Sequence, residues 1–326
     1  MTAPAAAPPA SAAPRAAGRL VRVALAGLTL ASVAGWLAPL GWPFELFVHF
    51  RVQLAAAAVL LVPLLMWARS RSGALLAVVL AAVHWMPGAR GLVAAPPVPA
   101  CAGAPFEIVA ANVKYTNRDP APLLAWLARG DADVVVLEEV TPSWSEPLAR
   151  IPAFPHVRIL PRDDPYGMAL LSRWPFEDVG TVDLAGDGMP SMRAVVRVRG
   201  EAVQVLGVHT RWPVLPNLAG LRDRALDAVA ARVRSASEPT VVVGDLNLTA
   251  DSPVFVRLLA TSGLHDAFAG RGWQPTWRAG FWPLALRIDH VLVSPTLCVE
   301  QAEVGPDIGS DHRPVAARLR LPRERG

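Results

Sequence analysis

Acidic, amide and imidazole side chains end or follow short apolar runs in the C-terminal two thirds of this 326-residue chain. Carboxylate and amide oxygens are the ligands that hard divalent cations such as Mg²⁺ favour. An imidazole titrates near neutral pH and can act as a general base. Together such groups can neutralise a phosphoryl group and align a deprotonated water, as hydrolysis of a phosphate ester requires. The candidates are Asn112, Glu139, His209, Asp245, Asn247, Asp289, Asp311 and His312.

The spacing of these residues indicates where some of them point. Asp245 and Asn247 lie two residues apart at the end of an apolar run, so their side chains can project to the same side. Glu138 and Glu139 are neighbours and on a strand must point to opposite faces. We expect Glu138 to be a salt-bridged or capping carboxylate. His312 is the candidate base, because a partner carboxylate would hold one tautomer of its ring and stabilise the imidazolium.

The elements that must position these side chains begin at about residue 106, as short strands with turns and a few helices. Helices are predicted over residues 120–129, 218–234 and 253–261. Some strands alternate with helices and others follow one another directly, so we expect two packed sheets of mixed order with helices outside. The predicted strands are residues 106–113, 134–138, 157–160, 168–172, 194–198, 203–209, 240–244, 288–293 and 315–321.

Several short motifs in this region carry a family resemblance. After Asn112 come VVVLEEV (134–140), YGMALLSR (166–173), VHT (208–210), GDLN (244–247), RIDHVLVS (287–294) and GSDHRP (309–314). From about Phe106 to Leu321 the chain resembles the endonuclease/exonuclease/phosphatase superfamily, and with N-terminal spans it looks like a membrane-anchored bacterial branch. The resemblance implies an α/β fold, a four-layer sandwich of two mixed β-sheets flanked by helices. It also implies a hydrolase of phosphodiester or phosphomonoester bonds that uses Mg²⁺ or Mn²⁺.

The resemblance assigns roles to most candidates around the metal. Glu139 matches the glutamate that binds the metal in this superfamily, and Asn112 would support the same ion or its waters through its amide oxygen. Asp311 would reach toward the metal site. Asp289 is the expected partner of the base, His312.

The same motifs suggest which residues face the scissile phosphate. His209 matches the position that donates to the phosphate, and Asn247 would face a phosphate oxygen. Asp245 would act on the nucleophile or on the leaving group, and the sequence leaves both roles open. Tyr166 and Arg193 are expected to bind substrate, although Tyr166 could only line the pocket and an arginine like Arg193 often pairs with surface acids.

Charge is distributed unevenly along the chain. Residues 1–105 contain seven arginines and one acidic residue, Glu45, whereas residues 106–326 carry 24 basic and 26 acidic residues. The N-terminal arginines flank hydrophobic runs, where they act as topology signals and do not form a phosphate-binding face. The balance of the C-terminal part argues against tight, non-specific binding of nucleic acid.

Three hydrophobic runs, at about residues 20–40, 47–67 and 73–87, are predicted to cross a membrane, although the third is marginal in length. A signal peptide is the competing interpretation of the first run, but two further runs follow it. The positive-inside rule places two sets of arginines in the cytoplasm and therefore everything after about residue 90 outside it. These arginines are Arg15, Arg19, Arg22, Arg69 and Arg71.

The predicted organisation is a disordered tail (1–19), a three-helix transmembrane anchor (20–87), a semi-rigid linker (88–105) and a catalytic domain (106–322). The expected location is the cell membrane, multi-pass, with the catalytic domain extracytoplasmic. Two cysteines exclude a disulfide framework and a Cys-rich zinc module. We expect Cys101 and Cys298 to stay unpaired, because Cys101 lies in the flexible linker and nothing in the sequence brings it to Cys298.

The sequence does not specify the substrate. A nucleic acid or a phospholipid headgroup could supply the phosphate ester, and membrane tethering makes phospholipid or sphingomyelin-type diesters a fair alternative to a nuclease. A catalytically silent phosphate-binding module is a further alternative, against which the complete set of candidates argues. No protein partner is implied. Four tryptophans could stack on bases or enter lipid headgroups but are expected to pack inside: Trp212, Trp273, Trp277 and Trp282.

Overall fold

The computed structural model describes residues 12–93, 101 and 103–321, and the chain divides into two compact units between Ala89 and Arg90. We call them the helical unit and the sheet unit, and each is described by itself. Parts of the predicted tail (1–11) and of the predicted linker (94–100 and 102) lie outside the described residues. The described parts of both segments are partly helical, because helix α1 begins at Ala12 and helix α4 continues to Val93.

The described part of the helical unit has three long helices, α1 (Ala12–Trp36), α3 (Arg51–Trp67) and α4 (Arg71–Val93). Two short elements, η1 (Ala38–Leu40) and α2 (Glu45–Val48), connect α1 to α3. The long helices form because their sequences are runs of apolar residues without a polar stripe. Leu25, Leu65 and Leu80 lie in the apolar core that these helices share.

One segment of the described helices, Ala16–Trp36 with 21 residues, is long and apolar enough to cross a membrane. The structure therefore supports one candidate span where the sequence predicted three. The difference is one of length, because the apolar parts of the other two helices, Arg51–Trp67 and Arg71–Met86, are shorter. The 17 residues of α3 rise about 26 Å, against a hydrocarbon core of about 30 Å.

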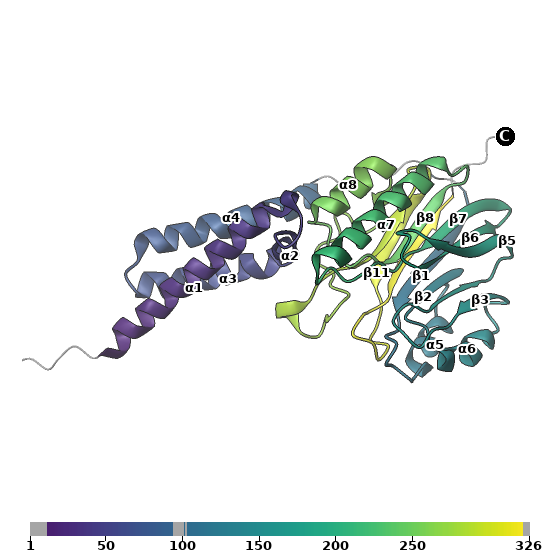
Figure 1. The fold of residues 1–326 in the computed structure, drawn as a ribbon, viewed down its shortest axis with the longest axis horizontal. Coiled ribbons are helices and arrows are strands. Elements are labelled where there is room, and N and C mark those ends of the chain that lie inside the picture. The colour runs from purple at the N-terminus through teal and green to yellow at the C-terminus, as the bar shows by residue number, and fades with distance from the viewer. Residues whose placement is uncertain (1–11, 94–100, 102, 322–326) are drawn as a thin grey trace, which may run out of the picture. The chain divides into compact units, whose positions relative to one another are not determined.

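The sheet unit is built on two six-stranded sheets (Figure 1). Their strand orders are β11-β12-β1-β2-β4-β3 and β5-β6-β7-β8-β10-β9. Each sheet has one parallel pair, β1 with β2 and β7 with β8, and its other pairs are antiparallel. This confirms the α/β sandwich of two mixed sheets. The strands are β1 (Pro105–Asn112), β2 (Val134–Glu138), β3 (His156–Leu160), β4 (Met168–Ser172), β5 (Phe176–Asp183), β6 (Pro190–Val198), β7 (Glu201–Gly207), β8 (Thr240–Asp245), β9 (His265–Asp266), β10 (Asp289–Val293), β11 (Cys298–Val304) and β12 (Val315–Arg320).

Apolar side chains fill three layers around these sheets. The layer between them joins residues of both, among them Val136 and Val243. Helices α5 (Ala121–Leu127) and α6 (Pro142–Ala149) cover the first sheet, and α7 (Pro216–Ser235) and α8 (Pro253–Ser262) cover the second. The central strands are apolar on both faces, as expected where a sheet is covered on both sides. Helices α5 and α7 connect the two parallel pairs, which require such a crossover.

The sequence missed strands at the sheet edges. β5, β9 and β11 are edge strands, and each mixes buried or half-buried residues with exposed ones. Such strands contain no continuous apolar run, so apolar runs do not reveal them. The central strands β2 and β4 were predicted with the bounds that the structure has.

Candidate active site

Polar residues at the ends of strands from both sheets lie close together. β1 ends at Asn112 and β2 at Glu138, and these two residues are paired in the parallel ladder. In the second sheet, β8 ends at Asp245, which pairs with Asp289 at the start of antiparallel β10. The amide of Asn112 donates to the carboxylate of Asp245 at 3.4 Å, which joins the two sheets at this end.

His312 and Asp289 form a close buried pair. Nδ1 of His312 lies 2.9 and 3.2 Å from the two carboxylate oxygens of Asp289, so Nε2 faces the rest of the site. Burial disfavours the imidazolium, but the carboxylates of Asp289, Asp245 and Asp311 outweigh burial and raise the pKa of His312 to about 10. Burial alone would raise the pKa of Asp289, but the nearby imidazolium lowers it below its usual value.

Asp245 lies between two imidazoles. Its Oδ2 is 3.7 Å from Nε2 of His312 and 3.8 Å from Nε2 of His209. Burial and the charge of Asp289 raise the pKa of Asp245 to about 7, although His312 opposes them. Burial and the charge of His312 lower the pKa of His209 to about 4. His209 is therefore a neutral ring beside Asp245 at neutral pH and not the cation of an ion pair.

Glu139 leaves strand β2 with a left-handed backbone, φ 59°, and its carboxylate reaches the end of β1. The amide of Asn112 donates to Oε1 of Glu139 at 2.9 Å, and the N–H of Tyr115 donates to Oε2 at 2.9 Å. The amide nitrogen of Asn112 thus lies between the carboxylates of Glu139 and Asp245. The structure brings these three residues together. The sequence predicted Glu139 and Asn112 for the metal, with Asp311, and gave Asp245 a catalytic role.

These oxygen-bearing side chains fit a hard divalent cation. Ligand atoms of Asp245, Asp289 and His312 all lie within 4.8 Å of one another. Asp289 and His312 are hydrogen-bonded to each other. Asp245 is therefore the residue of this group that could bind a cation, together with Glu139. The raised pKa of Asp245 indicates buried negative charge that a cation would balance.

Glu138 is completely buried and caps the end of β8 in the opposite sheet. Both of its carboxylate oxygens accept the N–H of Asp245, at 3.0 and 3.1 Å. Burial and the charges of Asp245 and Asp289 raise the pKa of Glu138 well above its usual value. Space for the carboxylate depends on Gly244, where a Cβ would lie 1.9 Å from Oε1 of Glu138. Of the two expectations, salt-bridged or capping, the structure shows the capping carboxylate.

Asn247 and His209 lie on segments that are tied to each other beside Asp245. The N–H of Asn247 donates to Oδ1 of Asp245 at 2.9 Å, and its side-chain amide donates to the carbonyl of Thr210 at 2.9 Å. The N–H of Thr210 donates to the carbonyl of Asp245 at 3.0 Å. These bonds set Asn247 and His209 on two sides of the same carboxylate.

Asp311 and Tyr166 lie at the rim of the site. The side chain of Asp311 is 34% exposed, and its Oδ1 lies 3.6 Å from Nζ of Lys114. The ring of Tyr166 is 5.9 Å from that of His209 between centroids. The guanidinium of Arg211 lies over the Tyr166 ring at 4.4 Å, which places a cation at this rim.

Arg193, predicted to bind substrate, lies away from the site. On β6, its guanidinium contacts Asp178 of β5 and donates to Gln204 of β7 at 2.8 Å. Gln204 donates in turn to Thr240, which begins β8, whereas the site lies where β8 ends. Arg193 therefore belongs to a polar network at the other end of the strand, because a nearby acid of an edge strand binds it there.

Two residues that the sequence reasoning missed support the base. Thr276 Oγ1 accepts the N–H groups of Ile288 and Asp289 at 3.2 and 3.3 Å. Ser310 donates to the carbonyl of Asn112 at 2.8 Å, and its Oγ accepts the N–H of His312 at 3.1 Å. Ser310 lies in the GSDHRP motif and could have been found there, whereas Thr276 lies in a loop without any motif.

Comparisons with known proteins agree with this arrangement. Residues 109–312 match the Endonuclease/Exonuclease/phosphatase family. No curated protein matches the chain. Similar solved structures include D. rerio TDP2 complexed with single-strand DNA product, which is 20% identical with a TM-score of 0.55 over 67% of this chain and 100% of that one. An endonuclease/exonuclease/phosphatase from Beutenbergia cavernae is 22% identical with a TM-score of 0.57, over 67% and 72%. The 3' phosphatase NExo from Neisseria, bound to a product DNA hairpin, is 22% identical with a TM-score of 0.55, over 65% and 98%.

Proposed function

Because this chain belongs to the endonuclease/exonuclease/phosphatase family, a family of metal-dependent phosphoester hydrolases, we propose that it hydrolyses phosphodiester or phosphomonoester bonds while attached to a membrane. The observation that carries the chemistry is the buried His312–Asp289 pair, whose free ring nitrogen lies 3.7 Å from Asp245. Glu139 and Asn112 complete the set at the same strand ends. A catalytically silent binding module would have no need of this complete set.

Glu139 and Asp245 would hold the metal, with Asp311 at its rim, and Asn112 would orient both carboxylates through its amide nitrogen. Carboxylate oxygens favour Mg²⁺ or Mn²⁺ over softer metals. When bound, such an ion would supply positive charge to the phosphoryl oxygens and polarise the phosphorus centre. Glu138 positions Asp245 through the backbone and is itself too enclosed to act as a ligand.

His312 would accept the proton of the attacking water at Nε2. Asp289 keeps the other proton on Nδ1 and stabilises the imidazolium that forms. With a pKa of about 10, the ring is protonated at neutral pH, so it works as a base only when a cation balances the carboxylate charge around it. His209, neutral at this pH, and the amide of Asn247 are then left to donate to the phosphate.

The substrate is either a nucleic acid or a phospholipid headgroup. Two similar structures, TDP2 from D. rerio and the Neisseria 3' phosphatase, were solved in complex with DNA, which favours a nucleic acid. The excess of acidic residues in residues 106–326 does not favour a general attraction to polyanions. Attachment to a membrane favours the phospholipid alternative.

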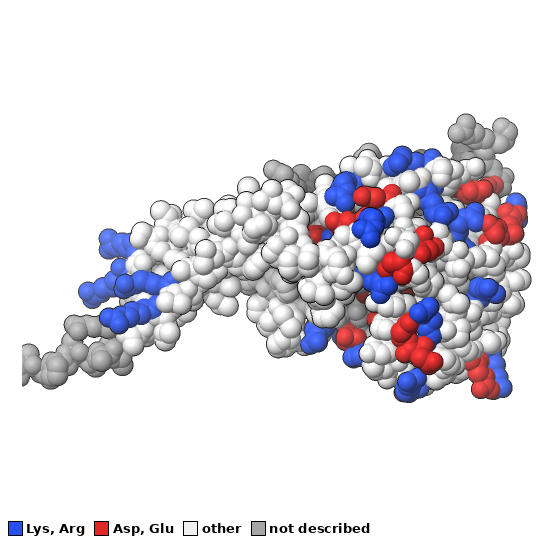
Figure 2. Space-filling view, in the orientation of Figure 1, with Lys and Arg blue, Asp and Glu red and all other residues white. Residues whose placement is uncertain are grey.

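The outward faces of the helical unit support membrane attachment. Leu20, Leu60 and Leu75, one on each long helix, are 70%, 63% and 66% exposed. Soluble proteins rarely expose apolar surface on this scale. Figure 2 shows an uncharged surface over most of the visible face of this unit, with Lys and Arg side chains at one end. We infer that the helical unit attaches the chain to the membrane, with α1 as the span.

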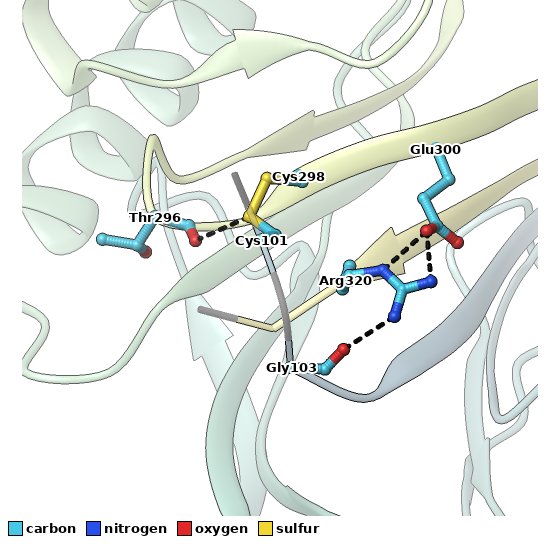
Figure 3. Close-up of a disulfide and its surroundings, with 6 residues drawn as sticks. All are labelled: Cys101, Gly103, Thr296, Cys298, Glu300 and Arg320. Atoms are coloured by element: carbon cyan, nitrogen blue, oxygen red, sulfur yellow. Dashed lines mark hydrogen bonds and ion pairs between the residues drawn. A yellow bond between two sulfur atoms is a disulfide. The ribbon is translucent and has the colours of Figure 1, made fainter. Parts of the chain in front are cut away.

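A disulfide supports an extracytoplasmic location for the sheet unit. Cys101 and Cys298 are bonded in the structure, so the prediction that they stay unpaired is wrong (Figure 3). The sequence reasoning failed because the pairing of β11 with β12 and of β12 with β1 brings Cys298 beside the chain that leads into β1. Disulfides persist in oxidising compartments and are rare in the cytosol. The arginines at the predicted inner ends of the helices indicate the same orientation.

Hydrolysis by the purified full chain tests the proposed chemistry. The substrates are bis(p-nitrophenyl) phosphate, p-nitrophenyl phosphate, DNA, RNA and phospholipid vesicles, each with Mg²⁺, Mn²⁺ or a chelator. We expect metal-dependent hydrolysis that His312→Ala reduces about 10²–10⁴-fold at every metal concentration, because metal cannot replace a base. Glu139→Ala should recover part of its loss at high Mn²⁺, since weaker binding is offset by mass action. Wild-type rates for His312→Ala on a verified substrate would remove the proposed base.

A fusion experiment tests the proposed orientation. Alkaline phosphatase fused after Leu321 should be active in cells, because it needs an oxidising compartment to fold. Bright fluorescence of a cytoplasmic-type GFP fused at the same place would show instead that the sheet unit is cytoplasmic.

A further inference from the structure

We propose that residues 273–284, here called the aromatic loop, dock the sheet unit onto the surface of a lipid bilayer. The proposal rests on the proposed membrane attachment and adds the surface through which the sheet unit meets the lipid. The loop exposes several large apolar side chains: Trp273 is 46%, Phe281 55%, Trp282 49% and Leu284 37% exposed. Packing inside the protein, which the sequence suggested for Trp273 and Trp282, therefore does not explain them.

The aromatic loop is distinct from the rest of the described surface of the sheet unit. The described part of the sheet unit has nine exposed large hydrophobic residues, and four of them lie in the aromatic loop. Figure 1 shows the segment in yellow-green, projecting away from the strands, and it ends in the short 3-10 helix η2 (Trp282–Leu284). An exposed apolar group of this size marks a site for a partner or for lipid.

The charge of the loop indicates a lipid surface as that partner. The aromatic loop contains one arginine, Arg278, and no acidic residue. Arg287 is turned back onto the sheet unit, where it pairs with Asp266 at 2.7 Å. The exposed Arg278 lies over the ring of Trp277, 5.0 Å from its centroid. Aromatic rings beside basic side chains are typical of protein segments at the membrane interface, where anionic headgroups attract the cation.

The backbone at the base of the aromatic loop is hydrogen-bonded to the segment that contains Asp311 and His312. Trp277 and Leu286 exchange backbone hydrogen bonds at 2.9 and 3.1 Å, and Trp277 also bridges to His312. The N–H of Arg278 donates to the carbonyl of Asp311 at 2.8 Å. Docking of the loop would therefore set the position of the proposed base relative to the lipid surface.

The length of the connection to the helical unit makes such docking easy. Helix α4 ends at Val93, and Cys101 is already bonded to Cys298 in the sheet unit. Eight residue steps span at most about 30 Å. The loop thus meets the bilayer as an intramolecular partner at high effective concentration, so a few aromatic side chains suffice for binding. Phosphate esters of lipid headgroups are then the substrates nearest to the site.

Site-specific fluorescence in the full chain tests the docking. Because the native cysteines are joined, Phe281→Cys gives one free thiol for an environment-sensitive fluorophore. Glu201→Cys is the matched control, since Glu201 is exposed and begins β7 at the end of the sheet away from the site. The labelled chains are reconstituted into vesicles of phosphatidylethanolamine and phosphatidylglycerol with or without doxyl-labelled lipid.

We expect doxyl lipid to cause a loss of emission from the label at position 281, which should lie roughly 5–10 Å into the interface, and no loss at position 201. No loss at position 281, or equal losses at both positions, would overturn the proposal. Blue-shifted emission at 281 without quenching would show that protein covers the loop, either the helical unit or a second copy, and would also refute it.

The outcome is separable from that of the proposed function. Quenching is measured without substrate and does not depend on turnover. Phe281→Ser should keep the rate of bis(p-nitrophenyl) phosphate hydrolysis in detergent, because this soluble ester needs no docking. A wild type that shows quenching at position 281 but no hydrolysis would refute the proposed hydrolase activity and support the docking. A wild type that hydrolyses the substrates without quenching would refute the docking and support the activity.

Discussion

Replacement of Asp289 by asparagine tests the proposed base most directly. Asp289→Asn keeps the size of the side chain and removes the charge that lies 2.9 Å from Nδ1 of His312. Two opposite charges about 4 Å apart attract by about 4 kcal/mol at an effective dielectric constant of about 20. This energy corresponds to about a thousandfold change in the affinity of His312 for its proton. The substitution should therefore lower the pKa of His312, which is held at about 10 in the wild-type site.

Two effects on hydrolysis follow from this change. A base works in its deprotonated form, so the wild-type rate should rise with pH until His312 has lost its proton. In Asp289→Asn this rise should move to lower pH, because the ring binds its proton more weakly. The maximal rate should fall about 10²–10⁴-fold, since the weaker base accepts a proton less readily and its ring is no longer held by a carboxylate.

The assay is the initial rate of bis(p-nitrophenyl) phosphate hydrolysis by the full chain at saturating Mn²⁺, measured from acidic to alkaline pH. Asp178→Asn is the matched control, because Asp178 contacts Arg193 away from the site and its loss should leave the profile unchanged. A wild-type profile and rate in Asp289→Asn would refute the reasoning. A lower rate with an unmoved acidic limb would mean that Asp289 orients the ring without tuning its basicity.

Three further predictions concern stability. In a chelator, Glu138→Gln should become more stable relative to the wild type as pH rises from about 4.5 toward 7, by up to about 1.4 kcal/mol per pH unit, because folded Glu138 stays protonated while its unfolded counterpart ionises; thermal unfolding of both proteins across this range measures the difference, and a difference that does not change with pH would contradict it. Gly244→Ala should cost more than about 2 kcal/mol in denaturant unfolding, because φ is +131° and the new Cβ would meet the carboxylate of Glu138 at 1.9 Å; a wild-type midpoint would contradict the geometry. Cys298→Ser should lower the free energy of unfolding by about 2–5 kcal/mol and keep hydrolysis, whereas an equal stability would show that Cys101 and Cys298 are not joined in the protein as made.

Much of the candidate site could be predicted because its residues lie at the ends of central strands. Val134–Glu138 and Met168–Ser172 are buried apolar runs, and such runs are visible in a sequence. The polar residue that ends each run marks the end of the strand. The resemblance to the family placed Asn112, Asp245 and the other candidates in one site, and the structure brings these two residues together.

What the sequence could not predict depends on contacts between distant segments. Glu138 was understood as a local neighbour of Glu139, but its partner is a backbone N–H at the end of a strand in the other sheet. Thr276 supports Asp289 from a loop that no pattern marks. Arg193 was expected to bind substrate, but its guanidinium contacts Gln204 and Asp178 away from the site. Each of these errors concerns the direction of a side chain and not the existence of an element.

In the proposed membrane attachment, the disulfide would also determine how mechanical load passes from the membrane into the sheet unit. Tension on the connection would pull at the first residues of β1, which pairs with β12 from Pro105 opposite Arg320 onward. A strand pulled from its end separates from its neighbour one hydrogen bond at a time. Because Cys101 is bonded to Cys298 ahead of this strand, the load passes into β11 first, and a clamp of Arg320 on Gly103 and Glu300 holds the same corner (Figure 3). In that attachment, the disulfide would keep membrane movement from separating β1, the strand that ends at Asn112, from its neighbour.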